Sequence, residues 1–226
     1  MNGCLFDNDE LAPGARVLRG FALGYSLDVE SISAAAPFRH MVAKNGFPMS
    51  VAMTNCGALG WVSDRKGYRY EPRDPLTGKP WPAMPAEFAR LAREAAARAG
   101  YSDFAPDACL INRYEPGAKM GLHQDRDEYD FAQPIVSVSL GLPATFVFGG
   151  AKRSDKTVRV ELEHGDVVVF GGPSRLFYHG VLALADGVHP VFKRSRLNLT
   201  FRRASDRATI STRRLAGGPN SQRSPL

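Results

Sequence analysis

The stretch Ile135-Val-Ser-Val-Ser-Leu140 alternates apolar residues with serines, which is typical of a β-strand with one buried face. We therefore predict a half-buried strand over residues 133–140. Further short runs rich in β-branched and aromatic residues predict strands over 109–114, 145–148, 158–162, 167–170 and 197–201. Clusters of turn-forming residues separate these runs. Many short strands at even spacing favour a sandwich or barrel.

The N-terminal half adds helices to this pattern. Residues 87–99 carry apolar side chains at helical spacing and are followed by Gly100, so we predict a helix that packs on a sheet. Other expected elements are a helix over 27–36, strands over 15–21 and 50–55, and an extended surface segment over 61–79. The predicted fold class is mainly β with flanking helices (α+β).

Composition and charge restrict the class of protein. The chain has 226 residues, a net charge of +6 and a pI near 9.4, which suit either a nucleic-acid partner or an ordinary basic enzyme. No apolar run is long enough to span a membrane, and acidic residues stand where a signal peptide would be basic. The three cysteines are widely spaced, so we expect neither a disulfide framework nor a thiolate zinc site, and we expect a cytoplasmic protein.

The sharpest chemical feature is His123-Gln124-Asp125, with His179 further along the chain. On a strand, residues two apart point to the same side, so His123 and Asp125 could hold one metal together. Two histidines and a carboxylate form the facial triad of non-haem iron(II) enzymes, which leaves metal positions open for other ligands. Taken alone, the short motif fits a surface turn, and His179 fits a buried histidine bonded to the backbone. Their place among predicted strands favours the metal site.

Arg196 is the second informative residue. In Arg196-Leu-Asn-Leu-Thr-Phe-Arg202, the polar residues share one strand face, and the apolar ones share the other, which should face the body of a sheet pair. A buried guanidinium is costly unless it is paired, and a bound dicarboxylate would pair with it in bidentate geometry. The alternative is an edge strand with solvated arginines, which we would favour if the triad were absent.

Ordered motifs extend along most of the chain. They are Met53-Thr-Asn-Cys-Gly57, Gly60-Trp61, Lys79-Pro-Trp-Pro-Ala-Met-Pro85, Leu110-Ile-Asn-Arg-Tyr-Glu-Pro-Gly-Ala-Lys119, Leu122-His-Gln-Asp125, Pro134-Ile-Val-Ser-Val-Ser-Leu-Gly-Leu-Pro143, His164-Gly-Asp-Val-Val-Val169, Ser174-Arg-Leu-Phe-Tyr-His-Gly180 and Arg196-Leu-Asn-Leu-Thr-Phe-Arg202. Over residues 15–203 the chain closely resembles the AlkB family of Fe(II)- and 2-oxoglutarate-dependent dioxygenases.

The resemblance implies a fold and a set of site residues. It implies a double-stranded β-helix, or jelly-roll, core with an N-terminal nucleotide-recognition lid. The implied iron ligands, which are also the catalytic residues, are His123, Asp125 and His179. The implied 2-oxoglutarate contacts are Arg196, which would pair with the distal carboxylate, and Asn112, Tyr114, Asn198 and Arg202. The implied substrate contacts are Met53, Trp61, Tyr68, Asp127 and Arg153.

The lid also makes physical sense from its own residues. Between Trp61 and Tyr70, aromatic residues alternate with Arg65, Lys66 and Arg69. Aromatic rings stack on bases and cations neutralise phosphates, so this segment favours a nucleic-acid substrate. The alternative is an ordinary basic surface loop. The family implies that Trp61 stacks on a flipped base and that Tyr68 lies at the mouth of the site.

The expected activity is oxidative demethylation of bases such as 1-methyladenine and 3-methylcytosine in DNA or RNA, with release of formaldehyde. The partner would be single-stranded nucleic acid or a duplex with a flipped base, no membrane would be bound, and the enzyme would be a monomer. Two alternatives are a dioxygenase of the same fold acting on a protein or small molecule, and a non-enzymatic jelly-roll binding module. The expected organisation is an extension (1–14), one dioxygenase domain (15–203) with a lid region (about 45–85) and a jelly-roll core (108–203), and a disordered basic tail (204–226).

Overall fold

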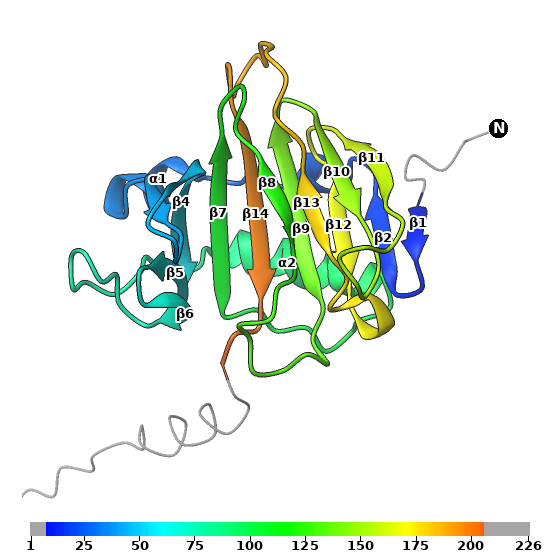
Figure 1. Ribbon diagram of the computed structural model, residues 1–226, viewed down its shortest axis with the longest axis horizontal. Helices are drawn as coiled ribbons and strands as arrows, with labels where there is room; N and C mark the ends of the chain where they lie inside the picture. Colours follow the sequence, from blue (N-terminus) through cyan, green and yellow to red (C-terminus); the bar gives the residue numbers. More distant parts are fainter. Residues whose placement is uncertain (1–7, 206–226) are drawn as a thin grey trace, which may run out of the picture.

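Two antiparallel sheets form the body of the computed structural model, which describes residues 8–205 (Figure 1). In spatial order, the larger sheet consists of β1 (Asn8–Ala12), β2 (Ala15–Leu18), β12 (Val167–Phe170), β9 (Ile135–Gly141), β14 (Arg196–Arg202), β7 (Ala108–Tyr114), β4 (Pro48–Gly57) and β3 (Arg39–Val42). The smaller sheet consists of β11 (Val158–Leu162), β10 (Ala144–Phe148), β13 (His179–Val181) and β8 (Met120–His123). These sheets are consistent with the predicted jelly-roll core and with a mainly β class.

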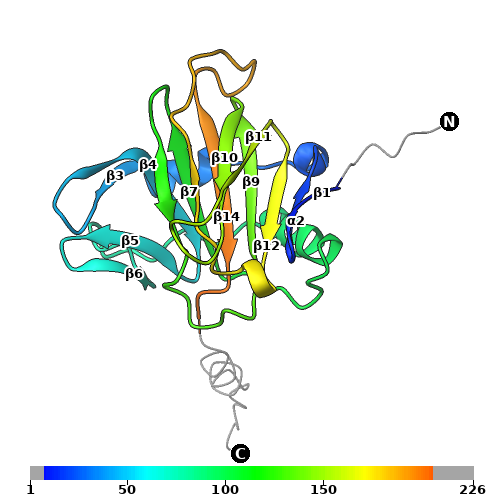
Figure 2. The same cartoon turned by 45° about the vertical axis from the view of Figure 1, so that its right-hand side comes forward.

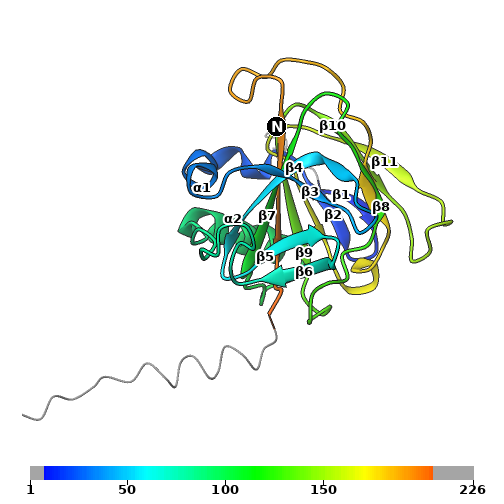
Figure 3. The ribbon, with the colours of Figure 1, turned by 60° about the vertical axis from the view of Figure 1, so that its left-hand side comes forward.

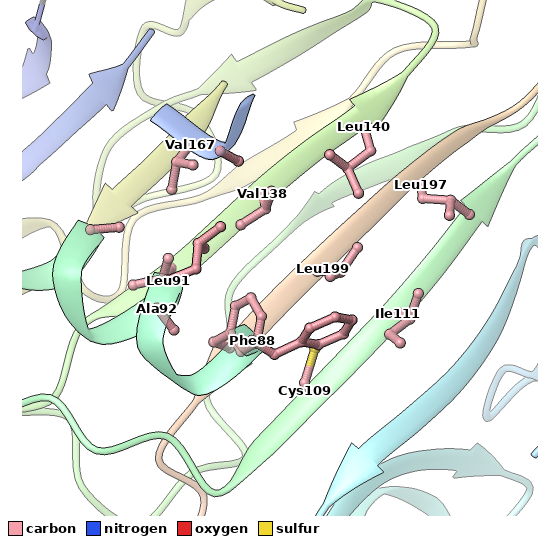
Figure 4. Packing of buried hydrophobic residues seen from close by; sticks show 14 of the residues in the cluster. Phe88, Leu91, Ala92, Cys109, Ile111, Val138, Leu140, Val167, Leu197 and Leu199 are labelled. Atoms are coloured by element: carbon pink, nitrogen blue, oxygen red, sulfur yellow. The ribbon is translucent and has the colours of Figure 1, made fainter. Parts of the chain in front are cut away.

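Helix α2 (Ala86–Arg98) covers the outer face of the larger sheet. Its apolar side packs on alternate residues of β9, β14 and β7, as Figure 4 shows for Phe88 and Leu91. The rings of Phe88 and Phe201 meet edge to face at 6.1 Å. Each fully buried side chain of this kind stabilises the fold by about 1.5–3 kcal/mol. The helix predicted over 87–99 is therefore confirmed, together with its packing on a sheet.

Polar and apolar residues lie on opposite faces of β14, as the alternation predicts, but the apolar face packs against an element that we did not expect. Leu197, Leu199 and Phe201 pack in the cluster under α2, not against the second sheet. The polar face of β14 therefore lies between the two sheets. Our expectation that the apolar set faces the sheet pair was wrong, because a helix already covers that side of the sheet.

Strand β9 is buried on both faces, whereas we expected it to be half-buried. Val136, Val138 and Leu140 pack toward α2. Ser137 and Ser139 point the other way, toward the polar residues of β14, and they hydrogen-bond to them. Serine is small enough to leave room for those longer polar side chains between the sheets.

Apolar packing fills the rest of the space between the sheets. Phe146 and Phe148 of the smaller sheet join Ile135, Val168 and Phe170 of the larger one in a second core cluster. The rings of Phe148 and Phe170 are 5.6 Å apart. This aromatic packing holds the two sheets together beside the polar face of β14.

The segment expected to be extended over 61–79 begins as a separate hairpin of β5 (Gly60–Asp64) and β6 (Gly67–Glu71). Gly67 has a φ of 109°, which its tight turn requires. Figure 3 shows this hairpin in front of the larger sheet. Hydrogen bonds between Asn55 and both the backbone N–H and the carbonyl of Trp61 connect the hairpin to β4.

Several other boundaries differ from the sequence-based predictions. The strand expected over 15–21 ends at Leu18 and is followed by the 3-10 helix η1 (Phe21–Gly24), because Gly20 turns the chain with a φ of 61°. The helix expected over 27–36 is shorter, as α1 (Glu30–Ala35). Residues 8–12, which we expected to precede the domain, form β1 at the edge of the larger sheet beside β2 (Figure 2).

Parts of the chain lie outside the described residues, namely 1–7 and 206–226, which include nearly all of the expected basic tail. Between residues 8 and 205, no helix is long and apolar enough to cross a membrane.

Candidate active site

Strand pairing brings the two histidines together. His123 ends β8, His179 begins β13, and the two residues are paired in register. Asp125 lies two residues beyond the end of β8, with carboxylate oxygens 3.6 Å from His123 Nε2 and 3.8 Å from His179 Nε2. Possible ligand atoms of all three residues lie within 4.8 Å of one another. An ion could therefore bind between them with little rearrangement.

Backbone contacts fix the orientation of both imidazoles. His123 Nδ1 lies 2.9 Å from the carbonyl oxygen of Gly121, and His179 Nδ1 lies 3.0 Å from that of Phe177. A carbonyl only accepts hydrogen bonds, so each Nδ1 carries a proton, and Nε2 is the ring atom that could bind a metal. This is the usual arrangement of metal-binding histidines, in which the second nitrogen donates to a neighbouring acceptor.

The electrostatics favour a neutral imidazole beside a charged carboxylate. Burial lowers the pKa of His179 to about 4, and His123 acts in the same direction, while Asp125 opposes both. Burial alone would raise the pKa of Asp125, but the charge of Arg202 and the two histidines hold that pKa below its usual range. Near neutral pH this donor set has the charge and ligand types that suit iron(II).

Arg196 lies nearby on the polar face of β14 and is only 1% exposed. Its Nη2 donates to Ser139 Oγ at 3.0 Å, and its guanidinium lies 5.0 Å from the centre of the Tyr114 ring. Within residues 8–205, its Nε and Nη1 have no hydrogen-bond partner. Burial lowers the pKa of this guanidinium, and Tyr114 partly offsets the effect. A buried cation with free donors fits a bound carboxylate, as 2-oxoglutarate would supply.

The other polar residues of β14 form a connected set. Asn198 donates to Ser137 Oγ and to the Val138 carbonyl oxygen, and it accepts from Thr200 and from Asn112. In the described part of the chain, Asn112 Oδ1 is buried without a partner, so it too could contact a bound molecule. These bonds fix the side chains that line the floor of the site.

One cavity of about 170 Å³ joins these features. Its lining contains all of the predicted site residues except Arg153: Met53, Trp61, Tyr68, Asn112, Tyr114, His123, Asp125, Asp127, His179, Arg196, Asn198 and Arg202. Arg153 lies outside the lining, where its guanidinium stacks 5.1 Å from the centre of the Tyr178 ring. The structure thus places three candidate metal ligands, a guanidinium with two unpartnered nitrogens and aromatic side chains around one space.

Known proteins share this chain's sequence and fold. Residues 25–202 match the family model of the 2OG-Fe(II) oxygenase superfamily. The α-ketoglutarate-dependent dioxygenase AlkB of Salmonella typhimurium is 60% identical over 203 residues, which cover 88% of this chain and 94% of that protein. AlkB of Escherichia coli is 59% identical over 200 residues, which cover 87% and 93%. The chain belongs to the AlkB family.

A solved structure of an AlkB-family protein, OsALKBH1, superposes on this chain with a TM-score of 0.73. It is 30% identical and covers 87% of this chain and 100% of its own. Membership identifies the chain as an enzyme, a dioxygenase that uses iron(II), 2-oxoglutarate and dioxygen. Independently of the comparisons, the unpartnered donors of Arg196 fit 2-oxoglutarate, and the closely spaced possible ligand atoms fit iron(II).

The β5–β6 hairpin, which is the candidate lid, contacts the site through aromatic residues. Trp61 Nε1 donates to Asp127 Oδ2 at 2.9 Å, and the rings of Trp61 and Tyr68 stack 5.5 Å apart. Asp127, which we predicted to contact the substrate, thus holds the indole in place. This contact could not be read from the sequence, because the two residues lie 66 positions apart.

The basic residues of the candidate lid differ in their exposure and in their ion pairs. Arg65 and Lys66 are exposed. Arg69 instead pairs with Asp64 and Glu71, which together raise the pKa of its guanidinium. We had grouped Arg69 with the phosphate-binding cations. Its two carboxylate partners make it a poorer candidate than its neighbours, because they already compensate its charge.

Sequence reasoning missed two buried charged residues of this AlkB-type site. Glu128 and Arg175 are 6% and 3% exposed, and they form an ion pair of 3.0 Å directly behind Asp125. Glu128 stands in the charged run Asp125-Arg-Asp-Glu, where a solvated turn is the ordinary interpretation. Arg175 falls within a motif of the family resemblance, but nothing in its local pattern indicates burial.

Proposed function

We propose that this dioxygenase removes alkyl groups from damaged bases in DNA, with 1-methyladenine and 3-methylcytosine as expected substrates, and that RNA is a second possible polymer. The observation that carries the proposal is a single cavity shared by the His123–Asp125–His179 cluster, the unpartnered Arg196 and the aromatic lid residues. Each wall of the cavity suits one component of such a reaction.

In this proposal, His123, Asp125 and His179 hold iron(II), and Arg196 holds the distal carboxylate of 2-oxoglutarate. The bound iron and keto acid supply the oxidising chemistry that hydroxylates an N-alkyl group. The protein contributes position and shielding. Asn112, Tyr114 and Asn198 line the cosubstrate side, and the hydrogen bonds of Asn198 keep that wall rigid.

The opposite wall would receive the base. Met53, Trp61 and Tyr68 give it apolar and aromatic surface, and Asp127 adds a carboxylate. An alkyl group on a pairing edge lies inside a duplex, so the base must be flipped out or already single-stranded. We also propose that the enzyme acts as a monomer.

The residues of the lid favour a nucleic-acid substrate over the alternative substrates, which are proteins and small molecules. An aromatic hairpin with exposed cations suits a stacked base and its phosphates, and neither alternative substrate requires that combination. The test is a panel of oligonucleotides with defined lesions, as single-stranded DNA, duplex DNA and RNA, analysed by mass spectrometry. Loss of the methyl group from at least the two expected lesions supports the proposal. Turnover of none of them, by a preparation that oxidises 2-oxoglutarate, contradicts it.

We expect oligonucleotide affinity to fall as salt rises, because exposed lid cations would release counterions from the phosphates. Arg65→Ala and Lys66→Ala should each reduce the slope of log affinity against log salt by about 1. Arg98→Ala on α2 removes the same charge from the outer side of the larger sheet and should change the slope little. Fluorescence anisotropy over a salt series measures this. Binding that does not depend on salt would refute the role of the basic lid.

Trp61→Ala should weaken oligonucleotide binding by about 1–3 kcal/mol if the indole stacks on the base. Trp61→Phe keeps an aromatic face but loses the hydrogen bond to Asp127, so it should recover part of the affinity. Equal affinity of the parent and Trp61→Ala would assign the stacking role to another side chain.

Asp127 should favour cationic lesions over neutral ones. Methylation at the 1-position of adenine or the 3-position of cytosine leaves a positive charge, which a carboxylate attracts, whereas 1-methylguanine is neutral. Asp127→Ala should lower repair of the cationic lesions roughly tenfold or more beyond its effect on 1-methylguanine, since hydrogen bonds to charged groups contribute about 1.5–3 kcal/mol. The measurement is the demethylation rate on matched single-stranded oligonucleotides.

The hydrogen bond from Trp61 makes a second variant necessary, because Asp127→Ala also frees the indole. Asp127→Asn keeps an acceptor for Trp61 Nε1 and removes only the charge. If charge is the cause, Asp127→Asn retains most of the selective loss on cationic lesions. An equal loss on cationic and neutral lesions in both variants would leave Asp127 only the role of positioning Trp61.

A further inference from the structure

A buried network of charged side chains lies behind the candidate iron site. At its centre is Glu128, whose carboxylate accepts two hydrogen bonds and forms a further ion pair. Oε1 accepts from the Tyr70 hydroxyl at 2.7 Å and lies 3.3 Å from Arg202 Nε, and Oε2 accepts from Arg175 Nη2 at 3.0 Å. Burying a carboxylate is costly unless it is fully paired, and here two guanidinium groups and a hydroxyl pair with it.

Arg175 connects the irregular segment 124–133 at three points. Its Nη1 donates to the Asp125 carbonyl oxygen at 2.8 Å, and its Nε donates to the Gln133 carbonyl oxygen at 2.9 Å. Together with the bond to Glu128, these contacts fix the start, middle and end of a segment that has no regular structure of its own. One buried side chain therefore contacts the Asp125 backbone and two further points of this segment.

Arg202 links Glu128 to the Asp125 side chain. Its Nη2 and Nε donate to Asp125 Oδ2 at 2.6 Å and 3.0 Å. Burial lowers the pKa of Arg202, but Asp125, Tyr70 and Glu128 together raise it above its usual range, so the group remains charged. With Oδ2 engaged, Oδ1 remains for a metal, and the orientation of the carboxylate depends on where Glu128 holds Arg202.

Tyr70 attaches the lid to this network. It belongs to β6, and its hydroxyl bond to Glu128 spans 58 positions in sequence. From Tyr70 a hydrogen bond therefore leads to Glu128, an ion pair leads from Glu128 to Arg202, and hydrogen bonds lead from Arg202 to Asp125. The cavity wall formed by the lid and the candidate iron ligand are thus fixed by the same carboxylate.

We propose that Glu128 is a positioning residue that couples the seating of lid strand β6, through the Tyr70 hydroxyl, to the orientation of Asp125 for metal binding. The inference rests on the proposed assignment of Asp125 as an iron ligand. Coupling of this kind is reciprocal: if metal loading stabilises the seated lid, then loosening the lid weakens metal binding by the same factor. The enzyme would thereby hold its metal most tightly when the lid is in place over the cavity.

The test uses Tyr70→Phe, which removes only the hydroxyl and leaves every charge in place. The full chain is titrated with Mn(II), a stand-in for iron(II) that avoids oxidation. Hydrogen exchange of peptides covering residues 60–71 is followed with and without the metal. In the parent, metal loading should slow exchange in β6. In Tyr70→Phe this slowing should disappear, and the affinity for Mn(II) should fall about fivefold or more.

Tyr25→Phe is a matched control, because Tyr25 also donates its hydroxyl to a glutamate that is paired with an arginine, Glu94 with Arg90. Glu94 and Arg90 lie on α2, away from the candidate iron site. In Tyr25→Phe, the metal-dependent exchange and the Mn(II) affinity should therefore match those of the parent. Glu128→Gln should perturb the structure more, since it removes the negative charge that pairs with Arg175 and Arg202. If it folds, its effect on both measurements should be at least as large as that of Tyr70→Phe.

Two outcomes would overturn the inference, and they are distinguishable. If Tyr70→Phe keeps both the metal-dependent slowing and the Mn(II) affinity of the parent, Glu128 has only a structural role, while the metal site stands. If the parent binds no Mn(II), the assignment of the ligands fails, and the coupling fails with it.

Discussion

Replacing His123, Asp125 or His179 by alanine is expected to reduce demethylation to near the detection limit, because each change removes one of only three candidate protein ligands. His123→Ala is the cleanest of the three, since the His123 side chain is 38% exposed and its loss disturbs little packing. Turnover is measured by formaldehyde release with saturating iron(II) and 2-oxoglutarate. Activity equal to the parent in any of these variants would refute the triad.

Asp125→Ala requires a control, because it also leaves the buried Arg202 without its closest partner. Breaking a buried ion pair typically costs about 3–5 kcal/mol of stability, so lost activity could reflect unfolding. Asp125→Asn keeps the shape and an acceptor for Arg202, and a thermal melt shows whether each variant is folded. A folded Asp125→Asn that binds Mn(II) as tightly as the parent would contradict the role of the carboxylate.

Arg196→Ala should raise the concentration of 2-oxoglutarate needed for half-maximal rate by a large factor. Truncating one partner of a buried, hydrogen-bonded charge pair costs about 2–5 kcal/mol, which corresponds to roughly 30-fold or more. The unpartnered Nε and Nη1 are the groups expected to make that contact. Isothermal titration of 2-oxoglutarate into the Mn(II)-loaded protein measures the affinity without turnover.

Arg196→Lys is the informative comparison, because lysine keeps the charge but lacks the planar fork. We expect only partial recovery of 2-oxoglutarate affinity. An unchanged affinity in Arg196→Ala would transfer the role to another cation of the cavity. Arg202 would be the next candidate, although Asp125 and Glu128 already occupy its donors.

The proximity of His123, Asp125 and His179 could be predicted from the sequence for a physical reason. The histidine–aspartate spacing and the later His179 fall next to strands, and strand pairing then brings the two histidines into register. The same holds for Arg196, because alternation along β14 separates polar from apolar residues. Alternation does not say what covers each face, so the helix over Leu197, Leu199 and Phe201 could not be predicted from that strand alone.

The parts that the sequence could not reveal depend on contacts between distant residues. Glu128 resembles a surface glutamate until Arg175, 47 positions away, and Tyr70, 58 positions away, pack against it. Likewise, Asp127 could be proposed as a substrate contact, but its bond to Trp61 required the fold of the lid hairpin. Strand β8 is too short to show an alternating pattern, and its position became clear only from its pairing with β13.

We expect this site to couple oxidation of 2-oxoglutarate to demethylation of a base. The most direct measurement incubates the purified chain with iron(II), 2-oxoglutarate, dioxygen and a single-stranded oligonucleotide that contains one 1-methyladenine. Succinate, formaldehyde and the mass of the oligonucleotide are followed together. We predict equal amounts of succinate and formaldehyde, matched by conversion to unmodified adenine. Succinate release with an unchanged oligonucleotide would contradict the account and would point to a dioxygenase with a different substrate.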